Sequence, residues 1–123
     1  MEPIPKTIRI YRDRTTDCLT VDPDPLTCHV EPEDPKKPEI FDQYVEWTST
    51  EEDYKDWRVV FGPQAPLSQE EEPKEKVATP DRPTMELRHK RPEDLRHVKY
   101  TVVALDRRTG MLDHKDPELI IET

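Results

Sequence analysis

The longest mostly apolar run of the chain is Tyr100-Thr101-Val102-Val103-Ala104-Leu105. Its β-branched and aromatic residues favour a strand, and the run is far too short to cross a bilayer, which requires about 20 apolar residues. We expect a central strand that is partly covered on both faces. The following residues, Arg107-Arg108-Thr109-Gly110, predict a turn in which Gly110 can adopt a positive φ.

Other strands are predicted by alternation of apolar and polar residues, because a half-buried strand has a period of two. In one of them Leu26, Cys28 and Val30 would face the core and His29 would face outward. Residues 49–52 and 91–95 carry signals of a helix start, and each is expected to form only one or two turns. The predicted strands are residues 7–12, 26–30, 44–48, 57–61 and 119–122. Together with the central strand they predict a single all-β sandwich over residues 1–123.

Long charged connections surround this small core. Of the 123 residues, 38% are charged and 14 are prolines, whereas average proteins have roughly 25% charged residues and about 5% proline. Residues 31–39 contain only Glu, Pro, Asp and Lys, which predicts an extended, solvated loop. Residues 68–94 predict a long polar loop or a partly disordered insertion, in which residues 84–88 alternate and could add an edge strand.

The net charge of −9 is concentrated in one stretch, with ten acids and three lysines between residues 31 and 56. This sign disfavours direct binding of nucleic acid and favours a protein partner with a basic surface. The first residues lack the basic and apolar regions of a signal peptide, so we expect a cytoplasmic protein without a membrane segment. Cys18 and Cys28 would then be reduced thiols; the alternative is a disulfide across a hairpin centred on Pro23.

The order of the strand segments also carries a resemblance. Val21-Asp22-Pro23-Asp24-Pro25-Leu26-Thr27-Cys28-His29-Val30 is followed by Asp42-Gln43-Tyr44-Val45-Glu46-Trp47 and Trp57-Arg58-Val59-Val60-Phe61. This progression resembles that of cupredoxin-like domains. The closing segments, Val98-Lys99-Tyr100-Thr101-Val102-Val103 and Asp116-Pro117-Glu118-Leu119-Ile120-Ile121, are similar to those of small bacterial proteins of that type. The resemblance implies a cupredoxin-like or Ig-like Greek-key sandwich.

A copper site does not follow from this resemblance, because blue copper requires a cysteine close to the last strand. The chain has no cysteine after Cys28, so we expect a sandwich without a cofactor. If a metal is bound, Cys28 and His29 are the candidate ligands, although neighbouring strand residues point to opposite faces. There is no glycine-rich phosphate loop and no nucleophile motif, so we do not expect an enzyme.

The acidic stretch is the strongest candidate for a binding surface. A non-enzymatic protein-binding or accessory module would use this acidic face, with aromatic residues among the acids as contacts, and the long loop would order on binding. The alternatives are a copper- or zinc-binding protein of cupredoxin type and an acidic inhibitor that mimics nucleic acid. The sequence leaves the identity of the partner and the oligomeric state open. The candidate partner-binding residues are Tyr44, Glu46, Glu51, Glu52, Asp53, Tyr54 and Asp56.

Overall fold

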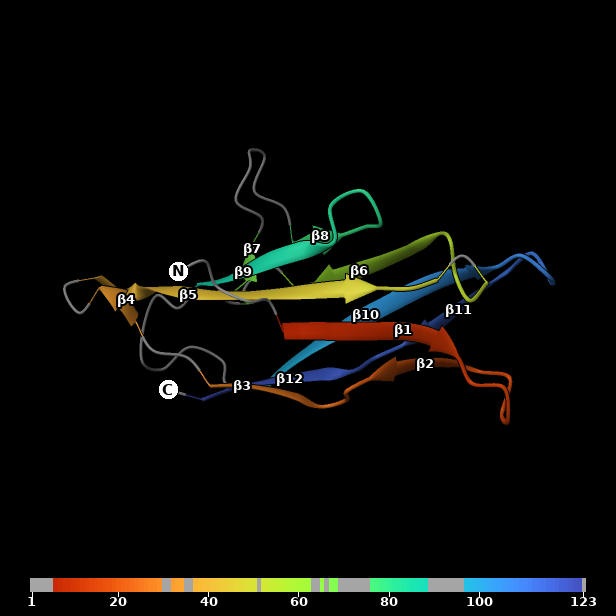
Figure 1. Ribbon diagram of the computed structural model, residues 1–123, viewed down its shortest axis with the longest axis horizontal. Coiled ribbons are helices and arrows are strands. Elements are labelled where there is room, and N and C mark those ends of the chain that lie inside the picture. The colour runs from red at the N-terminus through yellow and green to blue at the C-terminus, as the bar shows by residue number, and fades with distance from the viewer. Residues whose placement is uncertain are drawn as a thin grey trace.

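The computed structural model describes residues 6–29, 32–34, 37–50, 52–62, 65, 67–68, 76–88 and 97–122. These residues contain no helix, and their strands form two mixed sheets around one hydrophobic core (Figure 1). Parallel and antiparallel pairs occur in both sheets. The arrangement is that of a β-sandwich.

The first sheet is centred on a long strand near the middle of the chain. In spatial order its strands are β2 (Leu19–Asp22), β1 (Lys6–Arg12), β5 (Lys37–Thr48), β9 (Thr84–Arg88) and β7 (Leu67–Ser68), and β4 (Pro32–Asp34) pairs with β5. The long strand is β5, and β1 pairs parallel with it and antiparallel with β2.

The second sheet is built around the apolar run, which lies in β10 (His97–Asp106). β10 has β6 (Trp57–Phe61) along one edge, and β11 (Met111–Lys115) and β12 (Glu118–Glu122) along the other. The prediction of a central strand is confirmed. The spatial order is β3 (Leu26–His29), β12, β10, β6 and β8 (Val77–Ala78), with β11 paired to β10.

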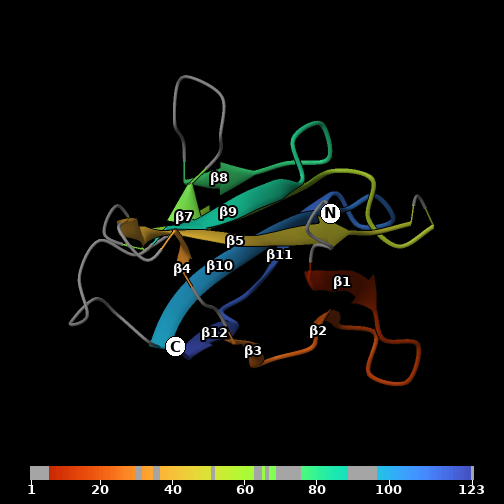
Figure 2. The same ribbon diagram turned by 60° about the vertical axis from the view of Figure 1, so that its left-hand side comes forward.

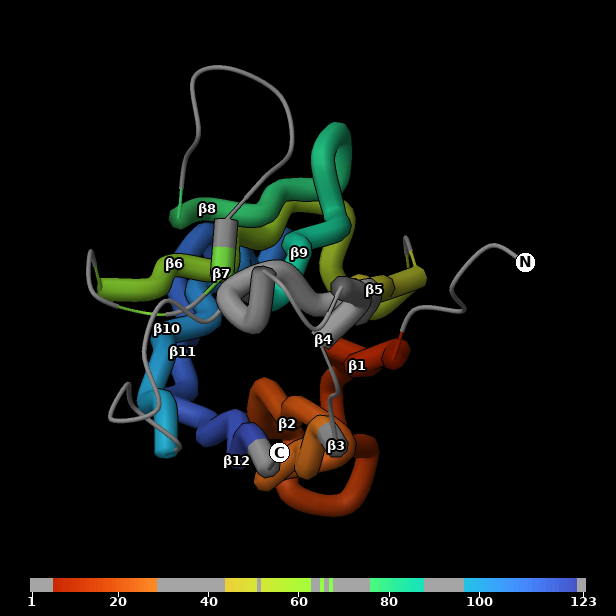
Figure 3. The backbone as a smooth tube through the Cα atoms, turned by 90° about the vertical axis from the view of Figure 1, so that its left-hand side faces the viewer, coloured from red at the N-terminus to blue at the C-terminus, as the bar shows by residue number. Residues whose placement is uncertain are grey.

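Three aromatic side chains join the two sheets in the core. The ring of Trp47, from β5, lies 5.7 Å from that of Phe61 on β6 and 5.9 Å from that of Tyr100 on β10, both edge-on. Phe61 and Tyr100 stack on each other at 4.7 Å. Seen along the strands, β1 and β5 lie on one side of this core and β10 and β11 on the other (Figure 3). The inward positions predicted for residues 45–47 and 57–61 are confirmed.

The chain changes sheets between β2 and β3. β2 pairs with β1 in the first sheet, and β3 pairs parallel with β12 in the second. Two cis peptide bonds, before Pro23 and Pro25, lie in the connection. β2 and β3 follow one another along the lower side of the molecule in Figure 2. The predicted hairpin centred on Pro23 is therefore wrong, and the disulfide alternative with it: Cys18 is an exposed free thiol and Cys28 a buried one.

Two predicted loops contain strands instead. Part of the segment 31–39 forms β4 and the start of β5, which pair with each other. Residues 84–88 form a strand, β9, as predicted. It is not an edge strand, because it pairs with β5 on one side and with β7 on the other, and its Met85 and Leu87 are buried in the core. The segment 68–94, predicted as a long polar loop or partly disordered insertion, also contains β8 at residues 77–78, which was not predicted; residues 69–75 and 89–94 lie outside the described residues.

The last hairpin was predicted only in part. Gly110 has a φ of 74°, as the turn signal predicts, and the final strand is present. β11, which follows the turn, has no clear alternation in its sequence and was not predicted. The described residues of the segment 49–52 are not helical; Thr50 O accepts the amide protons of Asp53 and Tyr54 in a single turn. The helical turn predicted for residues 91–95 lies outside the described residues.

Candidate functional site

The predicted binding residues divide between two places. Tyr44 and Glu46 lie half-buried on the outer face of β5, opposite Glu86 and Thr84 of β9. The others belong to the connection between β5 and β6, at one end of the sandwich. Glu51 lies outside the described residues. The acidic stretch therefore does not form one continuous face in the described part of the chain.

Tyr54 is not a surface residue, contrary to the prediction. Its side chain is 1% exposed, and its hydroxyl donates to Asp113 Oδ2 of β11 at 3.3 Å. Burial, followed by the nearby Asp113 carboxylate, raises the pKa of Tyr54 to about 12. Tyr54 therefore belongs to the hydrophobic core and not to the surface.

Asp53 is a structural acceptor instead of an exposed acid. Its side chain is 6% exposed and accepts hydrogen bonds from Arg14 Nη2 at 3.0 Å, Thr50 Oγ1 at 2.9 Å and the amide of Arg12 at 3.4 Å. Arg9 Nη2 lies 3.9 Å from the same carboxylate, and its guanidinium covers a tyrosine ring of the same strand. The charge of Asp53 is therefore neutralised within the chain.

A second ion-pair network binds the neighbouring turn. Arg108 Nη2 contacts Asp17 Oδ1 at 2.9 Å and Asp106 Oδ2 at 3.2 Å, and Arg12 Nε lies 3.5 Å from Asp17. The hydrogen bonds from Arg108 hold the pKa of Asp106 below its usual range. This network ties the connection between β1 and β2 to the turn between β10 and β11.

Glu52 and Asp56, the other described acids of the connection between β5 and β6, are exposed. Asp56 pairs with Arg107 at 2.9 Å, with both side chains about half exposed, and such pairs contribute little to stability. Glu52 is exposed beside an open depression of about 380 Å³ that is also lined by Arg9, Arg12 and Arg14. Because arginines are interleaved with the acids, this end of the molecule has a mixed charge.

The candidate metal ligands gain no support from their surroundings. Cys28 is fully buried, and burial raises the pKa of its thiol to about 11, which disfavours the thiolate that binds metal. The side chain of His29 lies outside the described ones. Among the residues that the structure describes, no three His, Cys, Asp or Glu side chains come together as a possible metal site.

An exposed apolar surface, which the sequence analysis missed, lies on the outer face of the second sheet. Val60, Val103, Leu105 and Leu112 face away from the core because they alternate with buried residues or pair with outward ones. We call these four residues the outer stripe. Val60 is 38% exposed and Leu112 is 67% exposed, while Val103 and Leu105 are half-buried. In the described part of the chain no further layer of strands covers this face.

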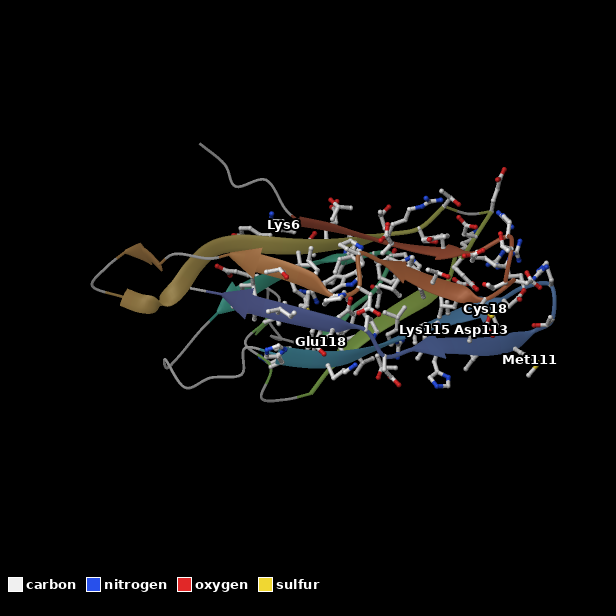
Figure 4. All side chains as sticks on the ribbon, turned by 90° about the horizontal axis from the view of Figure 1, so that it is seen from below. Lys6, Cys18, Met111, Asp113, Lys115 and Glu118 are labelled. Atoms are coloured by element: carbon white, nitrogen blue, oxygen red, sulfur yellow. The ribbon has the colours of Figure 1, made fainter. Side chains whose placement is uncertain are left out.

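Met111 is exposed but does not belong to the outer stripe, because it pairs with the buried Asp106 and alternates with Leu112 along β11. Met111, the first residue of the strand, is 66% exposed, and Figure 4 places it at the tip of β11, followed by Asp113 and Lys115 along the strand. The signal for the stripe was present in the sequence: Val60 occupies an outward position in an alternating strand, and β10 is apolar at outward as well as inward positions.

Polar side chains border the outer stripe. Arg58 of β6 and His114 of β11 stand on either side of Val103 in one row across the sheet, and both are exposed. In the next row Leu105 stands beside Leu112. An apolar centre with a polar border is the usual anatomy of a protein-binding surface.

Comparison with known protein families, curated sequences and solved structures finds no match to this chain. The cupredoxin-like resemblance therefore remains a prediction. Within the described residues, no helix has the length and apolar character that a membrane crossing requires.

Proposed function

We propose that this chain is a non-enzymatic protein-binding module that docks its partner on the outer stripe. The observation that carries the proposal is the alignment of exposed apolar side chains across β6, β10 and β11, with Leu112 67% exposed. Contiguous apolar surface on a soluble domain commonly marks an interaction site. Covering it removes apolar area from water, at roughly 25 cal/mol per Å².

The acidic stretch supports a second version of this function less well. Asp53 is engaged by arginines and Tyr54 is buried, so neither offers a contact to a basic partner. Ion pairing of Asp53 and Asp56 also leaves fewer free carboxylates for mimicry of nucleic acid. Of the predicted partner-binding acids that the structure describes, Glu46 and Glu52 remain for a basic partner to contact, and a test of docking must include one of them.

Affinity capture with matched variants tests the proposal. Tagged wild-type protein, Leu112→Asp, Val60→Asp and Thr48→Asp are incubated with an extract of the native cells, and the bound proteins are quantified by mass spectrometry. Thr48 is exposed on the first sheet, so it receives the same new charge away from the stripe. We expect each of the two stripe variants to capture at least tenfold less of a specific partner than the wild type does, which corresponds to about 1.4 kcal/mol of binding free energy. Thr48→Asp should capture this partner as the wild type does.

Glu52→Lys completes the comparison. Because Glu52 lies outside the outer stripe, its reversal should leave capture unchanged. Capture that survives Leu112→Asp and Val60→Asp but is lost in Glu52→Lys and at high salt would contradict the proposal and support a basic partner on the acidic residues. Circular dichroism of each variant confirms that the exposed substitutions leave the fold intact.

A further inference from the structure

Arg58 differs from five other arginines of this structure, whose side chains pair with acids. Arg9, Arg12, Arg14, Arg107 and Arg108 each contact an aspartate. Arg58 is exposed on β6 and has no ion pair or hydrogen bond with any side chain in the described part of the chain. In a protein of net charge −9, a guanidinium without such a partner beside an apolar surface is available to an outside carboxylate.

The register of the sheet places this guanidinium against the middle of the outer stripe. Arg58 pairs with Val103, which pairs on its other side with His114. His114 likewise has no side-chain partner among the described residues. The two nitrogen-bearing side chains therefore border the half-buried Val103 from opposite sides.

Apolar side chains of the outer stripe therefore lie on both sides of the row that holds Arg58 and His114. Val60 lies one row from Arg58 on one side, and the pair Leu105 and Leu112 lies one row away on the other. A partner that covers this surface must supply apolar side chains for the outer rows and an acceptor for Arg58. A buried guanidinium without an acceptor would oppose binding, because its desolvation would go uncompensated.

We propose, resting on the function proposed above, that the outer stripe binds a protein segment that carries apolar and carboxylate side chains, and that Arg58 holds one of these carboxylates. Arginine suits this contact because its planar fork can donate two hydrogen bonds to one carboxylate. The outer stripe of a second copy of this chain would offer apolar side chains beside another Arg58, and it contains no carboxylate of its own. The charge pattern therefore favours an acidic partner over self-association.

Short peptides of equal length provide the test. Three synthetic peptides share the same leucine and valine positions and differ only in the intervening residues, which are all Glu, all Gln or all Lys. Each is titrated into uniformly ¹⁵N-labelled protein, and backbone amide shifts are followed. We expect the Glu peptide to shift amides of β6, β10 and β11 saturably, and to bind at least several-fold more tightly than the Gln and Lys peptides.

Arg58→Gln isolates the proposed contact. We expect this variant to bind the Glu peptide about three- to tenfold more weakly, as loss of a charge-assisted pair implies, and to bind the Gln peptide as the wild type does. Lys55→Gln is the matched control, because Lys55 is an exposed cation on the connection before β6 and outside the stripe. It should leave both affinities unchanged.

Each other outcome overturns this partner chemistry. Equal affinities for the Glu and Gln peptides, or no shifts in the second sheet, would show that carboxylates are not recognised there. Tighter binding of the Lys peptide would indicate a basic partner. Concentration-dependent dimerisation in sedimentation that Leu112→Asp abolishes would assign the stripe to a second copy. The amount of partner that Leu112→Asp and Val60→Asp capture tests the proposed function, and that test does not depend on the peptide results.

Discussion

Replacing Trp47 with alanine should lower the free energy of unfolding by roughly 3–5 kcal/mol, the usual cost of removing a buried aromatic side chain. Trp47 is 1% exposed and contacts Phe61 and Tyr100 of the opposite sheet. Its indole Nε1 also donates to the Tyr100 hydroxyl at 3.5 Å. Truncation would open a cavity where the two sheets meet, so the loss comes from packing and not from local strand propensity.

Urea unfolding followed by far-UV circular dichroism measures this effect. Thr48→Ala is the control, because Thr48 is the next residue of β5 and is exposed; its effect should stay within about 0.5 kcal/mol. If Trp47→Ala and Thr48→Ala unfold at the same urea concentration, the packing of the two sheets on Trp47 is wrong.

Asp53→Ala should lower the free energy of unfolding by roughly 1–3 kcal/mol, because the donors that now share its carboxylate would lose their acceptor. Asp53 is 6% exposed and binds Arg14, Thr50 and the amide of Arg12. Asp56→Ala is the matched control, since Asp56 pairs with Arg107 at the exposed surface. That change should cost no more than about 1 kcal/mol.

The same pair of variants separates stability from binding. Below its unfolding transition, Asp53→Ala should capture the partner as the wild type does, because Asp53 does not belong to the outer stripe. A fully stable Asp53→Ala protein that fails to capture the partner would return Asp53 to the binding surface that the sequence predicts for it.

The strands with clear alternation could be predicted from the sequence. Residues 7–12 and 57–61 alternate, and the structure buries their inward apolar residues, which are Ile8, Ile10, Trp57, Val59 and Phe61. The central run at residues 100–105 could be identified by its composition. The spatial order of the strands could not, because residues 19–22 and 26–29 are close in sequence but belong to different sheets, and only their long-range partners decide this.

The candidate site was harder to predict for the same reason. The pairing of Arg14 with Asp53 joins residues that are distant in sequence, so charge counting could not reveal that this acid is neutralised. In β10, valines occupy both inward and outward positions, and composition alone does not separate a core valine such as Val102 from the surface valine Val103. The strand pairing distinguishes them, because the outward residues of β6 and β11 lie beside the outward residues of β10 and form the outer stripe with them.

The most direct measurement is covalent carbene footprinting of the free protein and of its complex with the captured partner. The docking assignment predicts that labelling of Leu112 and Val60 falls on binding, whereas labelling of Thr48 and Glu52 stays unchanged. Unchanged labelling of Leu112 and Val60, with protection of Glu46 and Glu52 instead, would contradict docking on the outer stripe.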